Sequence, residues 1–241
     1  TNREPQSIPW LALASRNARN RRTEQRFIAG FWTVAKLPST LNCMKRKLHL
    51  NLFIQSRGHH EASWRHPLAS PLAMTDIRYF QQLAQRAEAG LFDSIFLADT
   101  LAVWDDVERA ARTWLEPLTV LGALAVSTQR IGLIATASTT YSEPFNLARQ
   151  FASLDHMSGG RAGWNIVTTW SVPAAKNFGG EGQQSHDDRY TRAEEYLAVA
   201  KDLWDSWADN VLVDDRDSGQ YAHADRILPI DHKGDYYQVA G

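Results

Sequence analysis

Apolar and polar positions follow two alternating periods along the chain from Met44 onward. Short apolar runs of strand length alternate with longer stretches whose apolar residues recur every three to four positions, as in amphipathic helices. The pattern predicts strands at 47–55, 94–100, 130–140 and 162–170, and helices at 75–90, 116–129, 143–160 and 187–207. Beyond Trp207 the pattern lapses into an excursion, with short strands expected near 232–239.

Start and stop signals bracket the predicted helices. Thr75 or Asp76 is placed to cap the first helix, and Gly90 is placed to end it. The stretch Ser158-Gly159-Gly160-Arg161 predicts that the third helix stops abruptly and turns straight into a strand. A strand-and-helix pair therefore occurs four times, with no hairpin signal between the strands. This order predicts an α/β fold with a parallel sheet, right-handed crossovers and helices on the outside.

Each predicted strand finishes with polar residues. The polar ends are Gln55-Ser56, Asp99-Thr100, Thr136 to Thr140 and Asn165 to Thr169. In parallel α/β folds, ligands bind at the edge of the sheet where the strands end, so four polar strand ends would form one polar rim. Strand ends are often polar simply because the loops that follow them are exposed to solvent. Thr136, however, lies inside the run "GLIATAS" rather than at its end. The set of four therefore favours a binding edge.

Composition restricts the class of protein. The chain has 44% hydrophobic and 22% charged residues, which is ordinary for a soluble domain, and a formal net charge of −1. That charge gives no electrostatic reason to expect nucleic acid or an anionic membrane as a partner. The single cysteine, Cys43, excludes an internal disulfide framework, and no apolar run is long enough to span a bilayer. We expect a cytoplasmic protein.

Residues 1–43 lack any sustained period and include the arginine-rich stretch "SRNARNRRTEQR". We expect a disordered or artefactual extension here, with a transit peptide as the less favoured alternative. The ordered region is expected to cover 44–241.

The segment "NFGGEGQQSHDDRY" at 177–190 is a candidate phosphate site. It is a glycine-bearing loop that leads into a helix, and helix N-termini attract phosphate through their free N–H groups and dipole. His186 and Tyr190 are four residues apart and therefore share one face of the first turn. The structural alternative is that Asp187 or Asp188 acts as the N-cap, which is compatible with ligand binding.

Three histidines in "RGHHEASWRH" follow the first strand and raise the question of a metal site. His59 and His60 are adjacent, so their side chains diverge, and an alternating spacing would chelate better. Ordinary loop histidines or contacts to a substrate are therefore favoured, and we expect no metal. Nucleophilic catalysis has no support, because there is no G-x-S-x-G motif and Cys43 lies outside the ordered region.

Several long stretches resemble the bacterial luciferase-like flavin monooxygenases, and within them the nitrilotriacetate monooxygenase and dibenzothiophene sulfone monooxygenase group. The matching text is "SWRHPLASP", "AEAGLFDSIFLADT", "EPLTVLGALAVSTQRIGLIATASTTYSEPFNLARQFASLDHMSGGRAGWNIVTT" and "RYTRAEEYLAVAKDLWDSW". The resemblance runs from Met44 to Gly241, and the long central block is its most specific part.

This resemblance implies the N-terminal half of a (β/α)8 TIM-type barrel, with an insertion that starts after the fourth unit. It implies reduced FMN (FMNH2) as the cofactor, delivered by a separate NAD(P)H:flavin reductase, and O2 as the co-substrate. By position, the implied flavin contacts are Asp99, Thr136, His186 and Tyr190. A further phosphate-binding serine would lie beyond Gly241, and no catalytic residue is identified.

Two hypotheses remain open at this stage. The first is an FMNH2-dependent monooxygenase that acts on a small organic amine, aminopolycarboxylate or sulfur compound, and that forms a homo-oligomer. The second is a non-catalytic flavin-binding or decayed barrel fragment. Half of a barrel has open sheet edges, so we expect this polypeptide alone to fold poorly and to be inactive.

Overall fold

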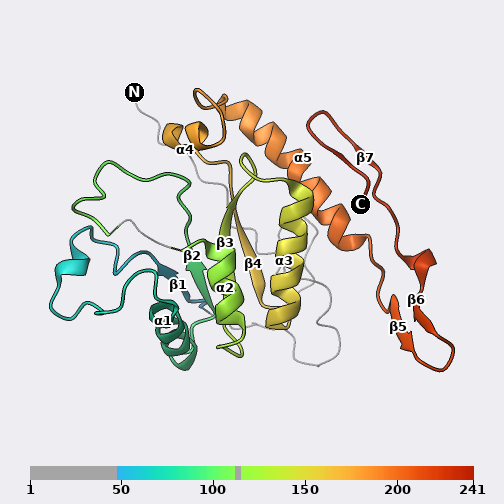
Figure 1. Ribbon diagram of the computed structural model, residues 1–241, viewed down its shortest axis with the longest axis horizontal. Helices are drawn as coiled ribbons and strands as arrows, with labels where there is room; N and C mark the ends of the chain where they lie inside the picture. The colour runs from blue at the N-terminus through green and yellow to red at the C-terminus, as the bar shows by residue number, and fades with distance from the viewer. Residues whose placement is uncertain (1–47, 112–114) are drawn as a thin grey trace, which may run out of the picture.

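A parallel sheet in the order β1-β2-β3-β4 forms the centre of the protein, as seen in a computed structural model that describes residues 48–111 and 115–241. Helices α1, α2 and α3 cover one face of this sheet, and α5 packs beside α3 (Figure 1). The strands of the sheet are β1 (Asn51–Ile54), β2 (Ser94–Leu97), β3 (Gly132–Ser138) and β4 (Ala162–Val167). The helices are α1 (Ile77–Ala89), α2 (Pro117–Ala125), α3 (Pro144–Ser158), α4 (Val172–Asn177) and α5 (His186–Asp205). The expected parallel α/β architecture is confirmed.

The predicted stop and start signals are confirmed at α1 and α3. Asp76 caps α1 by accepting a hydrogen bond from the backbone N–H of Arg78, and Gly90 follows its last turn. Gly159 and Gly160 adopt φ of 70° and 88°, and the N–H of Gly160 closes the helix onto the carbonyl of Asp155. This left-handed pair turns the chain directly into β4, because glycine carries no Cβ to oppose it.

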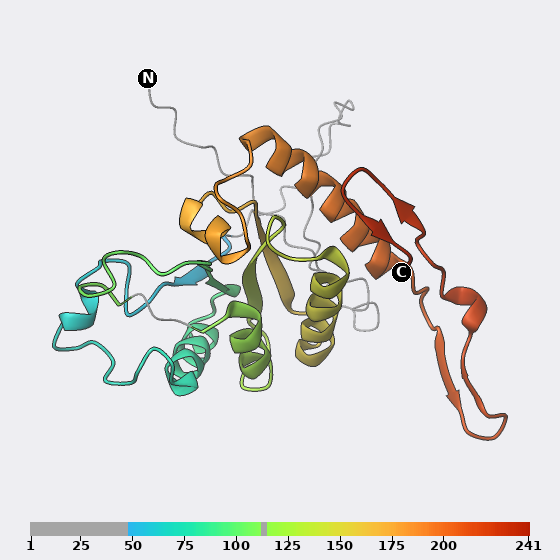
Figure 2. The same ribbon diagram turned by 45° about the horizontal axis from the view of Figure 1, so that its top comes forward.

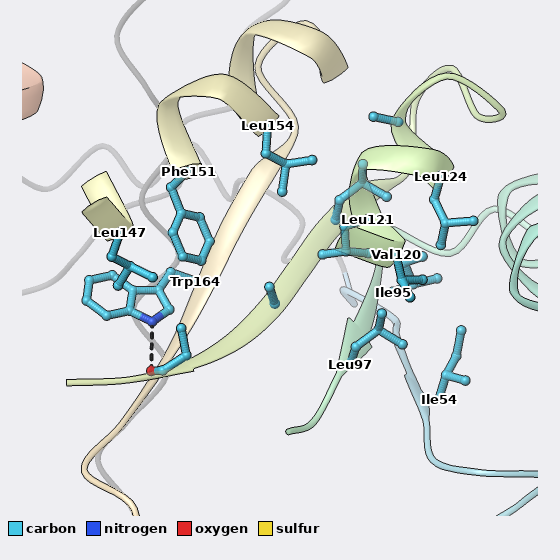
Figure 3. Packing of buried hydrophobic residues seen from close by; sticks show 14 of the residues in the cluster. Ile54, Ile95, Leu97, Val120, Leu121, Leu124, Leu147, Phe151, Leu154 and Trp164 are labelled. Carbon is cyan, nitrogen blue, oxygen red and sulfur yellow. Dashed lines mark hydrogen bonds between the residues drawn. The ribbon is translucent and has the colours of Figure 1, made fainter. Parts of the chain in front are cut away.

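The hydrophobic core lies between the sheet and the helices (Figure 3). Trp164 on β4 is 2% exposed and lies between the rings of Phe151 on α3 and Tyr196 on α5, at centroid distances of 5.6 and 5.8 Å. Its Nε1 donates to the carbonyl of Ala137 over 3.0 Å, so the one polar atom of the indole is satisfied inside the core. Trp164 is therefore a packing residue.

Beyond α5 the chain makes two short hairpins. The first, β5 (Leu212–Asp215) with β6 (Gln220–Ala222), projects away from the body of the protein (Figure 2). The second, β7 (His232–Lys233) with β8 (Gln238–Val239), lies along α5 and confirms the strands expected near 232–239. Two 3-10 helices, Ser63–Arg65 and Ala224–Arg226, complete the described elements.

The carboxylate of Glu195 on α5 fixes the second hairpin. It accepts hydrogen bonds from the backbone N–H groups of Tyr236 and Tyr237 and from the ring of His232, over 2.8–3.1 Å. Gly234 lies in the same turn, and a Cβ there would lie 2.0 Å from Oε1 of Glu195 and would displace that carboxylate. The hairpin is therefore part of the folded body.

Some expectations were wrong or are not tested. The stretch after β4 was expected to be a loop, but it contains α4, a helix too short to produce a period, which begins with Pro173 in its first turn. The interpretation of residues 1–43 and the place of Cys43 lie outside the described residues. Within those residues, none of the helices combines the length and apolarity that crossing a membrane requires.

Candidate active site

The C-terminal ends of β1 to β4 lie at one edge of the sheet, because all three pairings are parallel. The connections that leave this edge contact one another. Trp104 after β2 packs on Trp170 after β4, with centroids 5.8 Å apart, and Tyr141 after β3 stacks on Phe178 at 4.6 Å. Asn177 of α4 donates to the carbonyl of Leu101 over 2.7 Å. The connections that follow β2, β3 and β4 are thus joined to one another at the expected rim.

On the sheet face turned away from the helices, residues that are paired across neighbouring strands form successive layers. The lower layer pairs Phe53, Phe96, Ile134 and Gly163 across the four strands, and the rings of Phe53 and Phe96 pack at 4.6 Å. A Cβ at Gly163 would lie 3.0 Å from Cγ1 of Ile134, so glycine is needed for the close approach. This layer forms an apolar floor.

Polar residues stand above that floor. Thr136 on β3 is 5% exposed, and its Oγ1 accepts a hydrogen bond from Nδ2 of Asn165 on β4 over 2.9 Å. One layer higher, the hydroxyl of Thr169 donates to Oγ of Ser138 over 2.7 Å. Thr169 has φ of 46°, a left-handed conformation that is unusual for a threonine. The polar groups near the ends of β3 and β4 therefore stabilise one another across the strands.

Asp99 follows β2 at the same edge and is partly buried. Burial raises the pKa of its carboxyl, and the nearby carboxylate of Glu116 raises it further, against a hydrogen bond from the backbone N–H of Thr100. A carboxyl with a raised pKa in a polar rim is able to accept or donate a hydrogen bond to a ligand.

The rings of His186 and Tyr190 stack at 4.3 Å with 22° between their planes, so the prediction that they share one face of the helix is confirmed. The prediction that Asp187 or Asp188 caps this helix was wrong. Ser185 is the N-cap, because its Oγ accepts from the backbone N–H of Asp188 and donates to that residue's carboxylate. The S-x-x-D spacing places the two residues for this exchange, in which the carboxylate of Asp188 accepts from the hydroxyl of Ser185.

The four predicted flavin contacts thus come from three successive β/α units at one edge. Thr136 lies on β3, Asp99 lies on the connection after β2, and His186 with Tyr190 opens α5 after β4. Direct side-chain contacts join Thr136 to Asn165 and His186 to Tyr190. Whether the four share one ligand stays a prediction.

The connection from β4 to α5 carries two polar atoms that the sequence did not single out. Oγ of Ser171 and Oε1 of Gln183 are buried, and neither has a hydrogen-bond partner within the described parts of the chain. The two residues are joined by a hydrogen bond from Nε2 of Gln183 to the carbonyl of Ser171, over 2.6 Å. Buried polar atoms without partners are costly, so a partner such as a ligand, an ion or a water is expected there.

The two adjacent histidines after β1 diverge as predicted. His59 turns back onto β1, where its ring meets Phe53 edge-on at 4.8 Å, whereas Nδ1 of His60 accepts from the backbone N–H of Ala62. Across residues 48–111 and 115–241, no group of three or more His, Cys, Asp or Glu side chains has the arrangement of a metal site.

Comparisons with known proteins agree with this architecture. The sequence model of the family described as luciferase-like monooxygenase matches residues 50–241. Two curated relatives are N-acetyl-S-(2-succino)cysteine monooxygenase of Bacillus subtilis (strain 168), 47% identical over 82% of this chain, and nitrilotriacetate monooxygenase component A of Aminobacter aminovorans, 42% identical over 81%. The chain spans less than half of each relative, 45% and 46% of their lengths.

A solved structure, riboflavin lyase with modified FMN and its substrate riboflavin, has a TM-score of 0.74 and 35% sequence identity to this chain. The match covers 81% of this chain and 46% of that one. The expected fold, the N-terminal half of a luciferase-like TIM-type barrel, is confirmed by this likeness and by the four parallel β/α units. The chain belongs to the luciferase-like monooxygenase family.

Proposed function

We propose that this chain contributes the N-terminal half of the flavin site of an FMNH2-dependent monooxygenase. The residues proposed to contact FMN are Asp99, Thr136, His186 and Tyr190. The observation that carries the proposal is the polar rim, where buried hydroxyl groups and the partly buried carboxyl of Asp99 lie above an apolar floor at the ligand-binding edge of a parallel sheet.

The residues present fit such a ligand. Oγ1 of Thr136 accepts from Asn165, so its hydroxyl hydrogen remains available to donate to a bound molecule. The unpartnered atoms of Ser171 and Gln183 lie on the connection that leads to His186, where a polar ligand would satisfy them. Planar side chains such as the Tyr141–Phe178 and Trp104–Trp170 pairs line the same connections and match the flat, apolar part of a flavin.

When bound, reduced FMN activates O2, so that one oxygen atom enters the substrate and the other leaves as water. The role of this chain is to bind, orient and shield. Thr136 and Asp99 would hold polar groups of the cofactor by hydrogen bonds, and His186 with Tyr190 would close over it as a stacked pair. The apolar layer of Phe53, Phe96 and Ile134 would keep water from the reacting centre.

The proposed partner is a separate NAD(P)H:flavin reductase that delivers FMNH2. The relative from Aminobacter aminovorans supports a multi-component system, since it is itself a component A. The proposed substrate is a small organic amine, aminopolycarboxylate or sulfur compound, and the proposed assembly is a homo-oligomer.

Anaerobic titration of FMNH2 into the chain, followed by flavin fluorescence, tests this proposal. Asp99→Ala and His186→Ala are expected to weaken binding about tenfold each, through the loss of one hydrogen-bonded contact. Asp202→Ala and His156→Ala, exposed residues late in α5 and α3, are matched controls and should bind as the unchanged chain does. Equal affinity in all five proteins would overturn the site assignment. Binding without oxygenation by a full-length protein that contains this chain, once the reductase, substrate and O2 are added, would favour a non-catalytic flavin-binding protein.

A further inference from the structure

The turn that leaves β3 is closed by its own side chains. Oγ of Ser142 donates to the carbonyl of Ser138 over 2.5 Å, and the backbone N–H of Thr140 donates to Oγ of Ser138 over 3.2 Å. Within this turn lies Tyr141, whose ring stacks on Phe178 at 4.6 Å in the candidate flavin site. We call residues 138–142 the β3 turn. Its conformation therefore sets the position of the Tyr141 ring.

The end of β4 holds the first part of the β3 turn. The backbone N–H of Thr139 donates to the carbonyl of Val167 over 2.9 Å, and the hydroxyl of Thr140 donates to the carbonyl of Thr168 over 2.7 Å. Both bonds reach residues that come before Tyr141. The residue that follows it is held from helix α5.

The hydroxyl of Tyr196 on α5 lies 2.7 Å from Oγ of Ser142. Ser142 has a single hydroxyl hydrogen, which goes to the carbonyl of Ser138, so Tyr196 is the donor of this pair. Tyr196 is 0% exposed, and burial raises the pKa of its hydroxyl. The hydroxyl therefore stays protonated, and its hydrogen is committed to the β3 turn.

The β7–β8 hairpin, which lies along α5 (Figure 2), adds a second tyrosine beside the first. The ring of Tyr237 meets the ring of Tyr196 edge-on, with centroids 5.5 Å apart. The hydroxyl of Tyr237 accepts from Nε of Arg192 over 2.7 Å and makes a long hydrogen bond of 3.5 Å to the carbonyl of Thr139. Glu195, which fixes this hairpin, thereby also places Tyr237. The hairpin, α5 and the β3 turn are thus joined by a continuous series of contacts.

We propose that Tyr196 is a positioning residue for the flavin site. Its hydroxyl holds Ser142, and so keeps Tyr141 stacked on Phe178, where the flat part of the cofactor would pack. Loss of the hydroxyl alone leaves the aromatic ring in the core, so the effect falls on the β3 turn rather than on the packing of α5. The assignment rests on the proposed flavin site and adds to it a residue that acts through the turn.

Hydrogen exchange of the chain without flavin is the first test. Tyr196→Phe deletes only the hydroxyl, and the amides of Thr139 and Thr140 should exchange about tenfold faster while the amides of β2 keep their protection. Ser142→Ala removes the partner of that hydroxyl and should affect the same amides. Tyr236→Phe, at an exposed tyrosine, is the matched control and should change exchange less than about twofold. Faster exchange throughout the chain, or equal exchange in Tyr196→Phe and Tyr236→Phe, would overturn the proposal.

Anaerobic titration of FMNH2 separates positioning from general stability. Tyr196→Phe should weaken binding about fivefold, and this loss should shrink below about twofold in the Tyr141→Ala background, because the hydroxyl acts through that ring. Equal losses in the two backgrounds would overturn the positioning role. Lost protection in Tyr196→Phe, in a chain that binds no FMNH2 even when unchanged, would support the hold on the β3 turn and overturn the flavin site instead.

Discussion

Asn165 on β4 donates a hydrogen bond from Nδ2 to Oγ1 of Thr136 on β3 over 2.9 Å, in register across the two strands. This bond explains why a buried strand keeps a polar side chain on the face that looks away from the helices. Neither group is left unsatisfied, and the threonine hydroxyl keeps its hydrogen for a third partner. The pair thus links the two strands, and it also orients the hydroxyl of Thr136 to donate a hydrogen bond to a ligand.

A double-mutant cycle measures this pair. Thr136→Val leaves the amide of Asn165 without its acceptor, and Asn165→Leu leaves the hydroxyl without its donor, so each should cost about 1–3 kcal/mol of unfolding free energy. The double variant should cost less than the sum by about 1 kcal/mol, because no buried group then lacks a partner. Urea unfolding of the four proteins gives the coupling. Simple additivity would show that the two residues do not depend on each other.

Replacing Asp99 by Asn should stabilise the protein at neutral pH. Burial, with the charge of Glu116 adding to it, raises the pKa of Asp99 above the ordinary 3.8, so ionisation costs more in the folded state than in the unfolded state. Below pH 3.8 the carboxyl is protonated in both states and there is no penalty. The penalty develops as the pH rises through the folded-state pKa.

The Asp99→Asn substitution keeps an oxygen for the N–H of Thr100 and removes the charge. We expect a gain of order 1 kcal/mol near pH 7 that disappears near pH 3.5. Thermal unfolding at both pH values measures it. A gain of the same size at both would mean that charge is not its cause.

Glu88→Gln should show the opposite pH dependence. Glu88 on α1 accepts hydrogen bonds from the backbone N–H groups of residues 129–131, just before β3. Burial acts to raise its pKa, but these N–H groups and the charge of Arg130 outweigh burial and hold the pKa below 4.5. The stabilisation is therefore present above pH 4.5 and is lost as the pH falls through the folded-state pKa.

The expected cost of Glu88→Gln is about 1–3 kcal/mol at pH 7, shrinking near pH 3.5, by urea unfolding at each pH. Glu194→Gln, at an exposed position of α5, is the control. A loss that grows on acidification would contradict this account.

Gly234→Ala should release the β7–β8 hairpin from α5. The new methyl group would overlap Oε1 of Glu195, and the carboxylate would have to leave the N–H groups of Tyr236 and Tyr237. Hydrogen exchange should show lost protection at those two amides, at an overall cost of about 1–3 kcal/mol. Gly182→Ala is the control, since a Cβ there meets nothing within 4 Å. Unchanged protection in Gly234→Ala would disprove the docking role of Glu195.

The order and type of the main elements were predictable for two reasons. Their apolar residues repeat over long segments, and specific capping residues and glycines mark the ends of the helices. The glycine pair at 159–160 defines the end of α3, and Asp76 defines the start of α1. Helix α4, the β5–β6 hairpin and the two 3-10 helices were not predicted. Helix α4 has six residues, too few to establish a period, and every residue of strands β5 and β6 except Ala222 is exposed, so no alternation marks them.

Individual residues of the candidate site were predictable, but the way their side chains come together was not. The spacing of His186 and Tyr190 predicts their shared face, because helix geometry is local. The histidines of 57–66 stand out in the sequence, but the way their side chains are held was not predictable, because it depends on the turn at Gly58, which has φ of 129°, and on the 3-10 helix after it. The adjacent histidines His59 and His60 suggested a metal ligand or a substrate contact, but the ring of His59 packs against Phe53.

The order of the sheet, β1-β2-β3-β4, is also the order of synthesis. Every strand pairs with the one made just before it, at a separation of about 30 to 45 residues, so no partner has to wait for a distant segment. On the ribosome, each β/α unit is able to dock on its predecessor before the next one emerges. Growth by addition at a single edge makes nascent-chain folding a stepwise process, with β1 and β2 as its earliest contact.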